Sequence, residues 1–174
     1  MPSLVLIVGG DSQLGRSFAK FLSAKGKKFH ATTRRKALVA SDRPFLDLCK
    51  IDRLEFPHHY DVVVHFAGVT KLEECKKKPQ ETRKVNVDGV FAVSKYFSLM
   101  GAYQIFCSSD RAGDLPDQPV SERQMRNMPT EYGRQKAEAE NNLSTLKGIC
   151  VCRIPKVLGP DSKLITDWKR ELLA

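Results

Sequence analysis

The stretch VGGDSQLGRS (Val8–Ser17) decides how the fold of this chain is read. An apolar run of strand length precedes it, and a segment with apolar residues at helical spacing follows it. The stretch is therefore expected to form a tight turn from a strand into a helix. Gly9 can adopt the positive φ that such a turn can require, and Gly15 allows the helix to pack closely on the strand.

Strand-like and helical patterns alternate along the rest of the chain. The predicted strands are residues 4–8, 28–33, 44–46, 61–67, 103–108 and 149–154. One predicted helix follows the glycine-rich turn directly. The other predicted helices span residues 79–100, 130–146 and 164–174. Alternation of this kind is typical of a parallel sheet with right-handed crossovers. The sequence thus predicts an α/β fold: a Rossmann-like, doubly wound parallel sheet with helices on both faces.

The bulk composition indicates one globular domain. The chain has 174 residues, of which 41% are hydrophobic and 28% charged. No apolar stretch reaches the length that spans a bilayer, and the N-terminus lacks the pattern of a signal peptide. We therefore expect a cytoplasmic protein with no membrane association. The five cysteines show no paired zinc spacing, so we expect free thiols and no metal site.

The net charge of +9 is compatible with phosphate-bearing partners, nucleic acid among them. The densest basic cluster is Lys76–Lys78 with Arg83 and Lys84, and it falls in a predicted helical region. A solvated helix face is the favoured interpretation of such a run. Nucleic-acid binding is not expected, because no groove-reading motif or exposed aromatic series accompanies the charge.

The glycine-rich turn has the properties of a phosphate site. Free N–H groups at a helix N-terminus and the helix dipole favour an anion, so Ser12, Gln13 and Leu14 are candidates to contact it. The Cβ of Ser12 would hold a pyrophosphate slightly farther away, although its hydroxyl can donate a hydrogen bond in compensation. Asp11 is unfavourable beside a phosphate unless it points to solvent or caps the helix. A plain structural turn is the alternative.

The residues after the second predicted strand distinguish between two dinucleotides. An NAD-binding sheet usually places a carboxylate there, for the ribose 2′-hydroxyl. This chain has Arg34 and Arg35 instead, and guanidiniums suit a 2′-phosphate. The prediction is NADP in preference to NAD, with solvated surface charge as the alternative.

Tyr132 and Lys136 lie four residues apart on one predicted helix face. A nearby ammonium lowers the pKa of a phenol, which suits a tyrosine that transfers a proton at neutral pH. Ser108 and Ser109 end a predicted strand, where a hydroxyl can face the same cleft. Ala67 and Gly68 follow an earlier strand and leave room for a cofactor. An ordinary amphipathic-helix pair is the alternative for the tyrosine and the lysine.

Together these pieces resemble the extended short-chain dehydrogenase/reductases. The matching segments occur in family order and cover nearly the whole chain: VGGDSQLG, the Asp47-Leu48 pair, HFAGVT, VNVDGV, CSSD, YGRQKAEAE and RIPKVLGP. CSSD and YGRQKAEAE are most similar to the sugar-nucleotide branch that includes the dTDP-4-dehydrorhamnose reductases.

The resemblance implies a role for each motif. Tyr132 would be the general acid/base, Lys136 would hold the nicotinamide ribose and tune Tyr132, and Ser109 would orient the substrate oxygen, with Ser108 as the fallback. The implied cofactor contacts are Asp47 and Leu48 beside the adenine, Ala67 and Gly68 along the cofactor, and Ile154 and Pro155 beside the nicotinamide. Asn86 matches a family asparagine whose role here could be purely structural.

The expected function is an NADP-dependent oxidoreductase that reduces the 4-keto group of a nucleotide-linked sugar. A sugar-nucleotide epimerase or dehydratase is one alternative, and a non-catalytic NADP(H)-binding sensor or scaffold is another.

Ser12 and Asp11 depart from the usual G-x-x-G-x-x-G. All 174 residues are expected to form the NAD(P)-binding domain, with the substrate-binding lobe of the family absent or truncated. The resemblance also implies a homodimer through residues 79–100 and 130–146.

Overall fold

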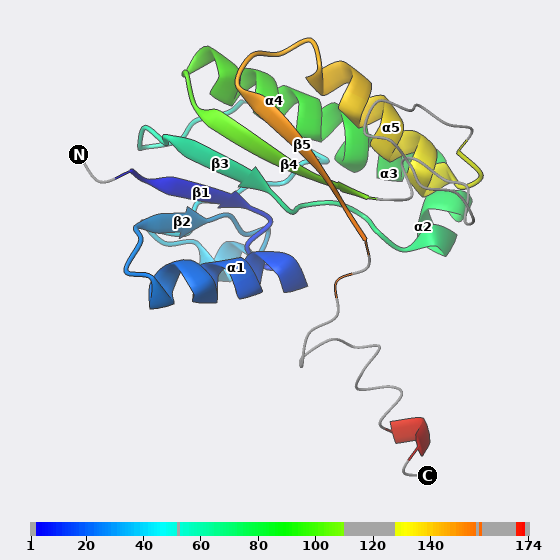
Figure 1. Ribbon diagram of the computed structural model, residues 1–174, viewed down its shortest axis with the longest axis horizontal. Helices are drawn as coiled ribbons and strands as arrows, with labels where there is room; N and C mark the ends of the chain where they lie inside the picture. Colours follow the sequence, from blue (N-terminus) through cyan, green and yellow to red (C-terminus); the bar gives the residue numbers. More distant parts are fainter. Residues whose placement is uncertain (1–2, 52, 110–127, 156, 158–169, 173–174) are drawn as a thin grey trace.

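The structure is a computed structural model that describes residues 3–51, 53–109, 128–155, 157 and 170–172. Its centre is a sheet of five parallel strands in the order β2-β1-β3-β4-β5 (Figure 1). The strands are β1 (Val5–Val8), β2 (Phe29–Ala31), β3 (Val62–His65), β4 (Tyr103–Ser109) and β5 (Ile149–Ile154). The predicted parallel α/β fold is confirmed.

Helices cover both faces of this sheet. They are α1 (Gln13–Ala24), the 3-10 turn η1 (Lys36–Leu38), α2 (Leu72–Lys77), α3 (Pro79–Arg83), the π-helix η2 (Lys84–Gly89), α4 (Val90–Leu99) and α5 (Glu131–Leu143). The strand order reverses at β1, which has β2 on one side and β3 on the other. Right-handed crossovers then place α1 on one face and α4 with α5 on the opposite face (Figure 1). A crevice for a ligand is expected at this reversal, beyond the carboxyl ends of β1 and β3.

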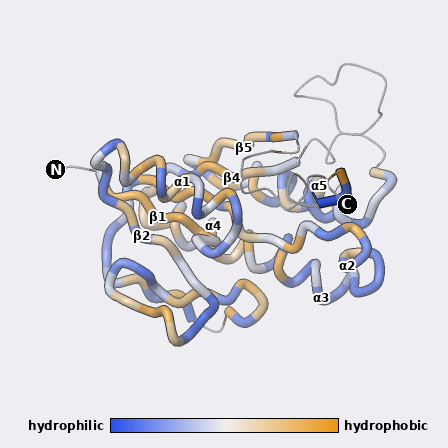
Figure 2. The backbone as a smooth tube through the Cα atoms, turned by 90° about the horizontal axis from the view of Figure 1, so that it is seen from below, coloured by the Kyte–Doolittle hydropathy of each residue, from blue (hydrophilic) through white to orange (hydrophobic). Residues whose placement is uncertain are grey.

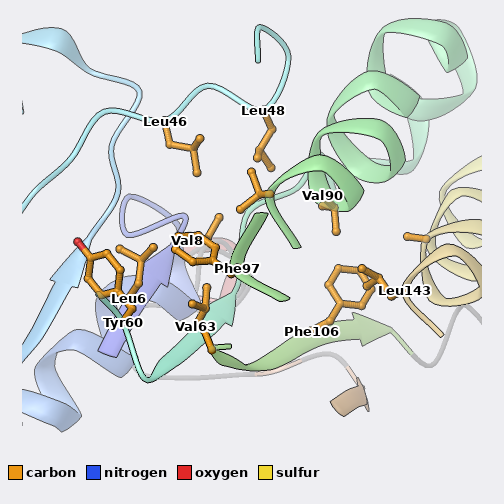
Figure 3. Close-up of a cluster of buried hydrophobic side chains, with 13 residues drawn as sticks. Leu6, Val8, Leu46, Leu48, Tyr60, Val63, Val90, Phe97, Phe106 and Leu143 are labelled. Carbon is orange, nitrogen blue, oxygen red and sulfur yellow. The ribbon is translucent and has the colours of Figure 1, made fainter. Parts of the chain in front are cut away.

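The main core lies between the sheet and the α4–α5 layer (Figure 3). Leu6 and Val8 are two residues apart in β1, so both side chains point to this face. They pack in one buried cluster with Phe97 of α4, Phe106 of β4 and Leu143 of α5. The core therefore fixes α5, with its predicted tyrosine and lysine, against β4.

The predicted strand at residues 44–46 is wrong. Only a single parallel bridge forms there, between Thr33 and Phe45. Pro44 has no N–H to donate, and its carbonyl and the N–H of Leu46 both bond to Thr33. The second strand is also shorter than predicted, because it ends at Ala31.

The predicted helix over residues 79–100 is continuous but changes its hydrogen-bond pattern at the π-helix η2. There Gly89 packs so closely on the backbone of Leu48 that any side chain at residue 89 would clash with it. The predicted helix over residues 130–146 ends earlier, at Leu143. The hydroxyls of Ser144 and Thr145 bond to carbonyls one turn back, which competes with continuation of the helix.

The basic cluster lies on the helical layer beyond β3. Lys76 and Lys77 are exposed in the last turn of α2, a helix that was not predicted, because the predicted helix begins only at residue 79. Figure 2 shows hydrophilic stretches along this part of the backbone. Arg83 forms ion pairs with Asp88 and Glu138, so part of the charge is neutralised locally.

Within the described ranges, no helix is long and apolar enough to cross a membrane. Residues 113–127, which connect the predicted strand at 103–108 to the predicted helix at 130–146 and are expected to form a loop, lie outside the described residues. So does most of the helix predicted at residues 164–174, of which residues 170–172 are described and helical.

Candidate functional site

A cavity of about 250 Å³ opens at the carboxyl ends of β1, β2 and β3. This is the position expected for a ligand of a doubly wound sheet. Seven of the residues proposed from the sequence as cofactor contacts line it: Gly9, Ser12, Arg34, Asp47, Leu48, Ala67 and Gly68. The tertiary structure thus brings together residues from three separate loops.

Gly9 controls how closely these loops approach one another. Its φ is +90°, and a Cβ at this position would lie 2.6 Å from the backbone nitrogen of Ala67. Its N–H donates a hydrogen bond to the hydroxyl of Thr32, 2.9 Å away. Gly15 is equally constrained, because a side chain there would clash with the carbonyl oxygen of Gly9. Both glycines therefore have the structural roles predicted from the turn.

Ser12 is the N-cap of α1. Its φ of −71° is ordinary for an L-residue, so the turn does not require glycine at this position. Its hydroxyl oxygen accepts a hydrogen bond from the N–H of Gly15 at 3.0 Å, which leaves the hydroxyl hydrogen free to donate. The cap satisfies one first-turn N–H, and those of Gln13 and Leu14 have no acceptor within the described chain. The turn therefore retains donors for an anion.

Asp11 follows neither of the two alternatives left open by the sequence, because Ser12 caps the helix and the Asp11 carboxylate is held by other side chains. Its carboxylate accepts a hydrogen bond from Thr33 at 2.7 Å and ion-pairs with Arg35 at 2.8 Å and Arg43 at 2.5 Å. These three donors, Arg35 foremost, hold the pKa of Asp11 far below its usual value of 3.8. Asp11 is therefore a fixed negative charge whose surroundings are strongly basic.

The two predicted guanidiniums are in different environments. Arg34 lines the cavity, and no ion pair involving it occurs among the described residues. Arg35 is 61% exposed, does not line the cavity and is held by Asp11. Arg34 is consequently the guanidinium best placed for an anionic ligand in this cavity.

The far wall of the cavity is held by a buried amide. Asn86 of η2 accepts from the N–H of Val69 at 2.8 Å and donates to the carbonyl of Val69 at 3.0 Å. Its amide also donates to Gln135 of α5 at 2.9 Å. Asn86 thus fixes the loop that carries Ala67 and Gly68, which is a structural role.

The predicted catalytic residues lie on α5 and β4 rather than around this cavity. Lys136 is 6% exposed, and its ammonium donates to the carbonyl oxygen of Cys107 at 2.8 Å. Burial lowers its pKa to about 8. Tyr132 and Ser109 are half-buried, whereas Ser108 is buried on the other side of β4. None of these four is among the described residues that line the cavity.

The last predicted contacts lie at the end of β5. Ile154 is the register partner of Ser109 across β4 and β5 and is half-buried, and Pro155 follows it. Neither lines the cavity. The cavity therefore contains most of the residues assigned to the adenosine and pyrophosphate, without Gln13, Leu14, Gly15 and Arg35, and the residues assigned to the nicotinamide end do not line it.

Sequence reasoning missed three residues of this region. Thr32 and Thr33 use their hydroxyls to hold Gly9 and Asp11, and Arg43 reaches Asp11 from a tight turn closed by a bridge to Ala40. The threonines are the last two residues of the strand predicted at 28–33, so their position at a strand end was a usable signal. No pattern in the sequence marks Arg43, because its contact spans 32 residues.

The glycine turn at the switch point of a parallel sheet is the arrangement found in dinucleotide-binding proteins. Residues 3–167 match the family described as RmlD substrate binding domain. The chain belongs to this family. The match confirms the predicted resemblance to the extended short-chain dehydrogenase/reductases of the dTDP-4-dehydrorhamnose reductase type.

Individual relatives support the same grouping. Methionine adenosyltransferase 2 subunit beta from Bos taurus is 29% identical over 168 residues, which are 92% of this chain and 48% of the relative. Spore coat polysaccharide biosynthesis protein SpsK from Bacillus subtilis (strain 168) is 26% identical over 158 residues, which are 89% of this chain and 53% of that protein. The chain therefore spans about half the length of the curated relatives it matches.

Among solved structures, dTDP-4-dehydrorhamnose reductase from Bacillus anthracis str. Ames in complex with NADP has a TM-score of 0.79 at 20% identity. The comparison covers 98% of this chain and 61% of that one. The similarity confirms the Rossmann-like fold.

Proposed function

We propose that this chain is the dinucleotide-binding part of an NADP-dependent oxidoreductase that reduces the 4-keto group of a nucleotide-linked sugar. One observation carries the proposal. A single cavity at the switch point gathers the glycine turn, Arg34, Asp47 and the loop at Ala67 and Gly68. The family membership of the chain supports the same function.

The residues around the cavity fit a dinucleotide. Arg34 and the first-turn N–H groups of α1 are donors for phosphate oxygens. Gly68 leaves space, since a Cβ there would meet only the side-chain oxygen of Asn86, at 3.2 Å. Leu48 is apolar and contributes to a surface on which an adenine can pack. These features support NADP as the cofactor, with NAD as the alternative.

The predicted chemistry divides between the cofactor and three side chains. A nicotinamide cofactor, when bound, would supply the hydride. Tyr132 then gives the proton to the substrate oxygen, and the Lys136 ammonium one turn away favours the phenolate that remains. Ser109 orients that oxygen from the end of β4.

Two measurements test the proposal. NADPH should bind the chain in a fluorescence titration, and the full-length protein should consume NADPH when given a 4-keto sugar nucleotide. Tyr132→Phe should abolish this turnover and leave NADPH affinity unchanged. Tyr103→Phe is the matched control, because Tyr103 is 51% exposed at the opposite end of β4. Full turnover by Tyr132→Phe would contradict the assignment.

A sugar-nucleotide epimerase or dehydratase would use the same tyrosine and lysine. These reactions return the hydride to the substrate, so they proceed without net consumption of NADPH. Product analysis by mass spectrometry and NMR after incubation with a sugar nucleotide separates them from a reductase.

A non-catalytic NADP(H)-binding subunit is the second candidate. The ammonium of Lys136 is engaged by the Cys107 carbonyl, and the relative from Bos taurus is named as a subunit of another enzyme. This candidate predicts NADPH binding by the full-length protein without turnover of any sugar nucleotide.

A homodimer through residues 79–100 and 130–146 is compatible with both candidates, and a monomer in light scattering at high concentration would exclude it.

A further inference from the structure

The carboxylate of Asp11 connects three separate segments. Asp11 lies in the turn after β1, Thr33 and Arg35 follow β2, and Arg43 belongs to the tight turn at residues 40–43. The hydroxyl of Thr33 and the guanidiniums of Arg35 and Arg43 all donate to this one carboxylate, at 2.5–2.8 Å. We call these four residues the Asp11 cluster.

The Asp11 cluster lies at the position where a dinucleotide-binding sheet contacts the ribose of the adenosine. In NAD-binding sheets, a carboxylate at the end of the second strand accepts a hydrogen bond from the ribose 2′-hydroxyl. In this chain the second strand is followed by Thr32, Thr33 and Arg34, with no acid. Asp11 brings a carboxylate to the same place from the neighbouring turn, and it lines the cavity together with Thr33 and Arg34.

The charged side chains at this ribose position would have opposite effects on a 2′-phosphate. Arg34 lines the cavity and attracts an anion, while Arg35 and Arg43 are bound to Asp11. A 2′-phosphate would approach Arg34 and the Asp11 carboxylate together, so attraction and repulsion partly cancel. A 2′-hydroxyl carries no net charge, so it is free of this charge–charge attraction and repulsion, and it can donate a hydrogen bond to a carboxylate. The carboxylate is 27% exposed, so solvent screens this repulsion only in part.

We propose that Asp11 is a specificity-determining residue that reduces the preference of this cavity for 2′-phosphorylated over unphosphorylated adenosine. The inference rests on the proposed nucleotide function but concerns only the adenosine end of the cofactor. Asp11 orients Arg35 and Arg43 and opposes the phosphate that Arg34 attracts. Its charge therefore brings the affinities for NADP(H) and NAD(H) closer together than the arginines alone would.

Titration calorimetry with two adenosine fragments tests this without turnover. The probes are 2′,5′-ADP and 5′-AMP, which differ only in the 2′-phosphate. Asp11→Asn keeps the size of the side chain and an oxygen that accepts from Thr33. We expect the ratio of the two dissociation constants to shift about fivefold towards 2′,5′-ADP, the effect of removing one partly screened charge.

Asp42→Asn is the matched control. Asp42 is an exposed carboxylate next to Arg43, and it does not line the cavity. Its removal changes the net charge by the same amount, so we expect a shift of less than about twofold. Equal shifts in both variants would show a general charge effect and overturn the proposal. An unchanged ratio in Asp11→Asn would also overturn it.

A second variant covers the case in which Asp11→Asn does not fold, as judged by circular dichroism. Arg43→Gln leaves the Asp11 charge in place with one fewer guanidinium around it. The ratio should then move towards 5′-AMP, and a move towards 2′,5′-ADP would contradict the proposal. If the wild-type chain binds neither fragment, the proposed function itself fails, and this is visible before any variant is measured.

Discussion

The ammonium of Lys136 donates a hydrogen bond to the carbonyl oxygen of Cys107, 2.8 Å away, and lies 4.0 Å from the centre of the Phe106 ring. A charge on α5 is thereby buried against β4. Because burial penalises the charged form, the pKa of Lys136 falls from 10.5 to about 8. The side chain predicted to hold a cofactor is therefore also part of the helix–sheet contact.

Lys136→Met should change the pH dependence of stability. Between pH 8 and 10.5 the unfolded state binds more protons at Lys136 than the folded state, so the wild type gains stability as pH rises through this range. The gain should be about 3 kcal/mol at most. Urea unfolding at both ends of the range measures it, and the variant should lack this increment. Parallel pH profiles for wild type and variant would contradict the assignment.

Ser12→Ala should lower the free energy of unfolding by about 1 kcal/mol, because the N–H of Gly15 loses its capping acceptor. Thr130→Ala is the control, since Thr130 caps α5 through the N–H of Gly133 at the same distance of 3.0 Å. Both variants should lose similar stability in chemical denaturation. Only Ser12→Ala should change NADPH affinity, because Ser12 lines the cavity and Thr130 does not.

Gly9→Ala should be strongly destabilising. The residue has φ +90°, and the added Cβ would lie 2.6 Å from the nitrogen of Ala67, so we expect a loss of about 3 kcal/mol. Gly26→Ala isolates the backbone effect. Gly26 also has positive φ but nothing within 4 Å of the added Cβ, so its loss should be about 1 kcal/mol. Equal losses in thermal or urea unfolding would show that the contact with Ala67 is unimportant.

Glu140→Gln should weaken the attachment of β5. Glu140 on α5 binds Arg153 of β5 through several hydrogen bonds, and the two side chains are only 10% and 22% exposed. We expect a loss of about 2 kcal/mol on removal of this charge.

Glu131→Gln provides the comparison for this ion pair. Glu131 bonds to Arg134, which is 56% exposed, three residues further along the same helix. The loss there should be below about 1 kcal/mol. Hydrogen exchange of β5 should accelerate in Glu140→Gln only, and faster exchange in both variants would contradict the prediction.

Local sequence patterns predicted the strands and the glycine turn, because both are determined by residues that lie close together in the sequence. Apolar runs of strand length specify β1 and β3, and β5 has the predicted bounds, Ile149–Ile154. Gly9 and Gly15 were assigned by their spacing between a strand and a helix, and their conformations agree. The strand predicted at residues 44–46 was wrong because strand pairing depends on donors, and Pro44 has none.

The sequence by itself determined a parallel α/β sheet, its glycine turn and the set of loops that surround one cavity. Only the tertiary structure decided which charged side chains are buried and which groups they pair with. Asp11 appeared unfavourable for a phosphate site, yet three donors from distant segments surround it, and Lys136 is buried against a carbonyl of β4. The energy of a charge depends on its solvation and on its neighbours in space. Those neighbours lie up to 32 residues away in the chain, beyond the reach of any local pattern.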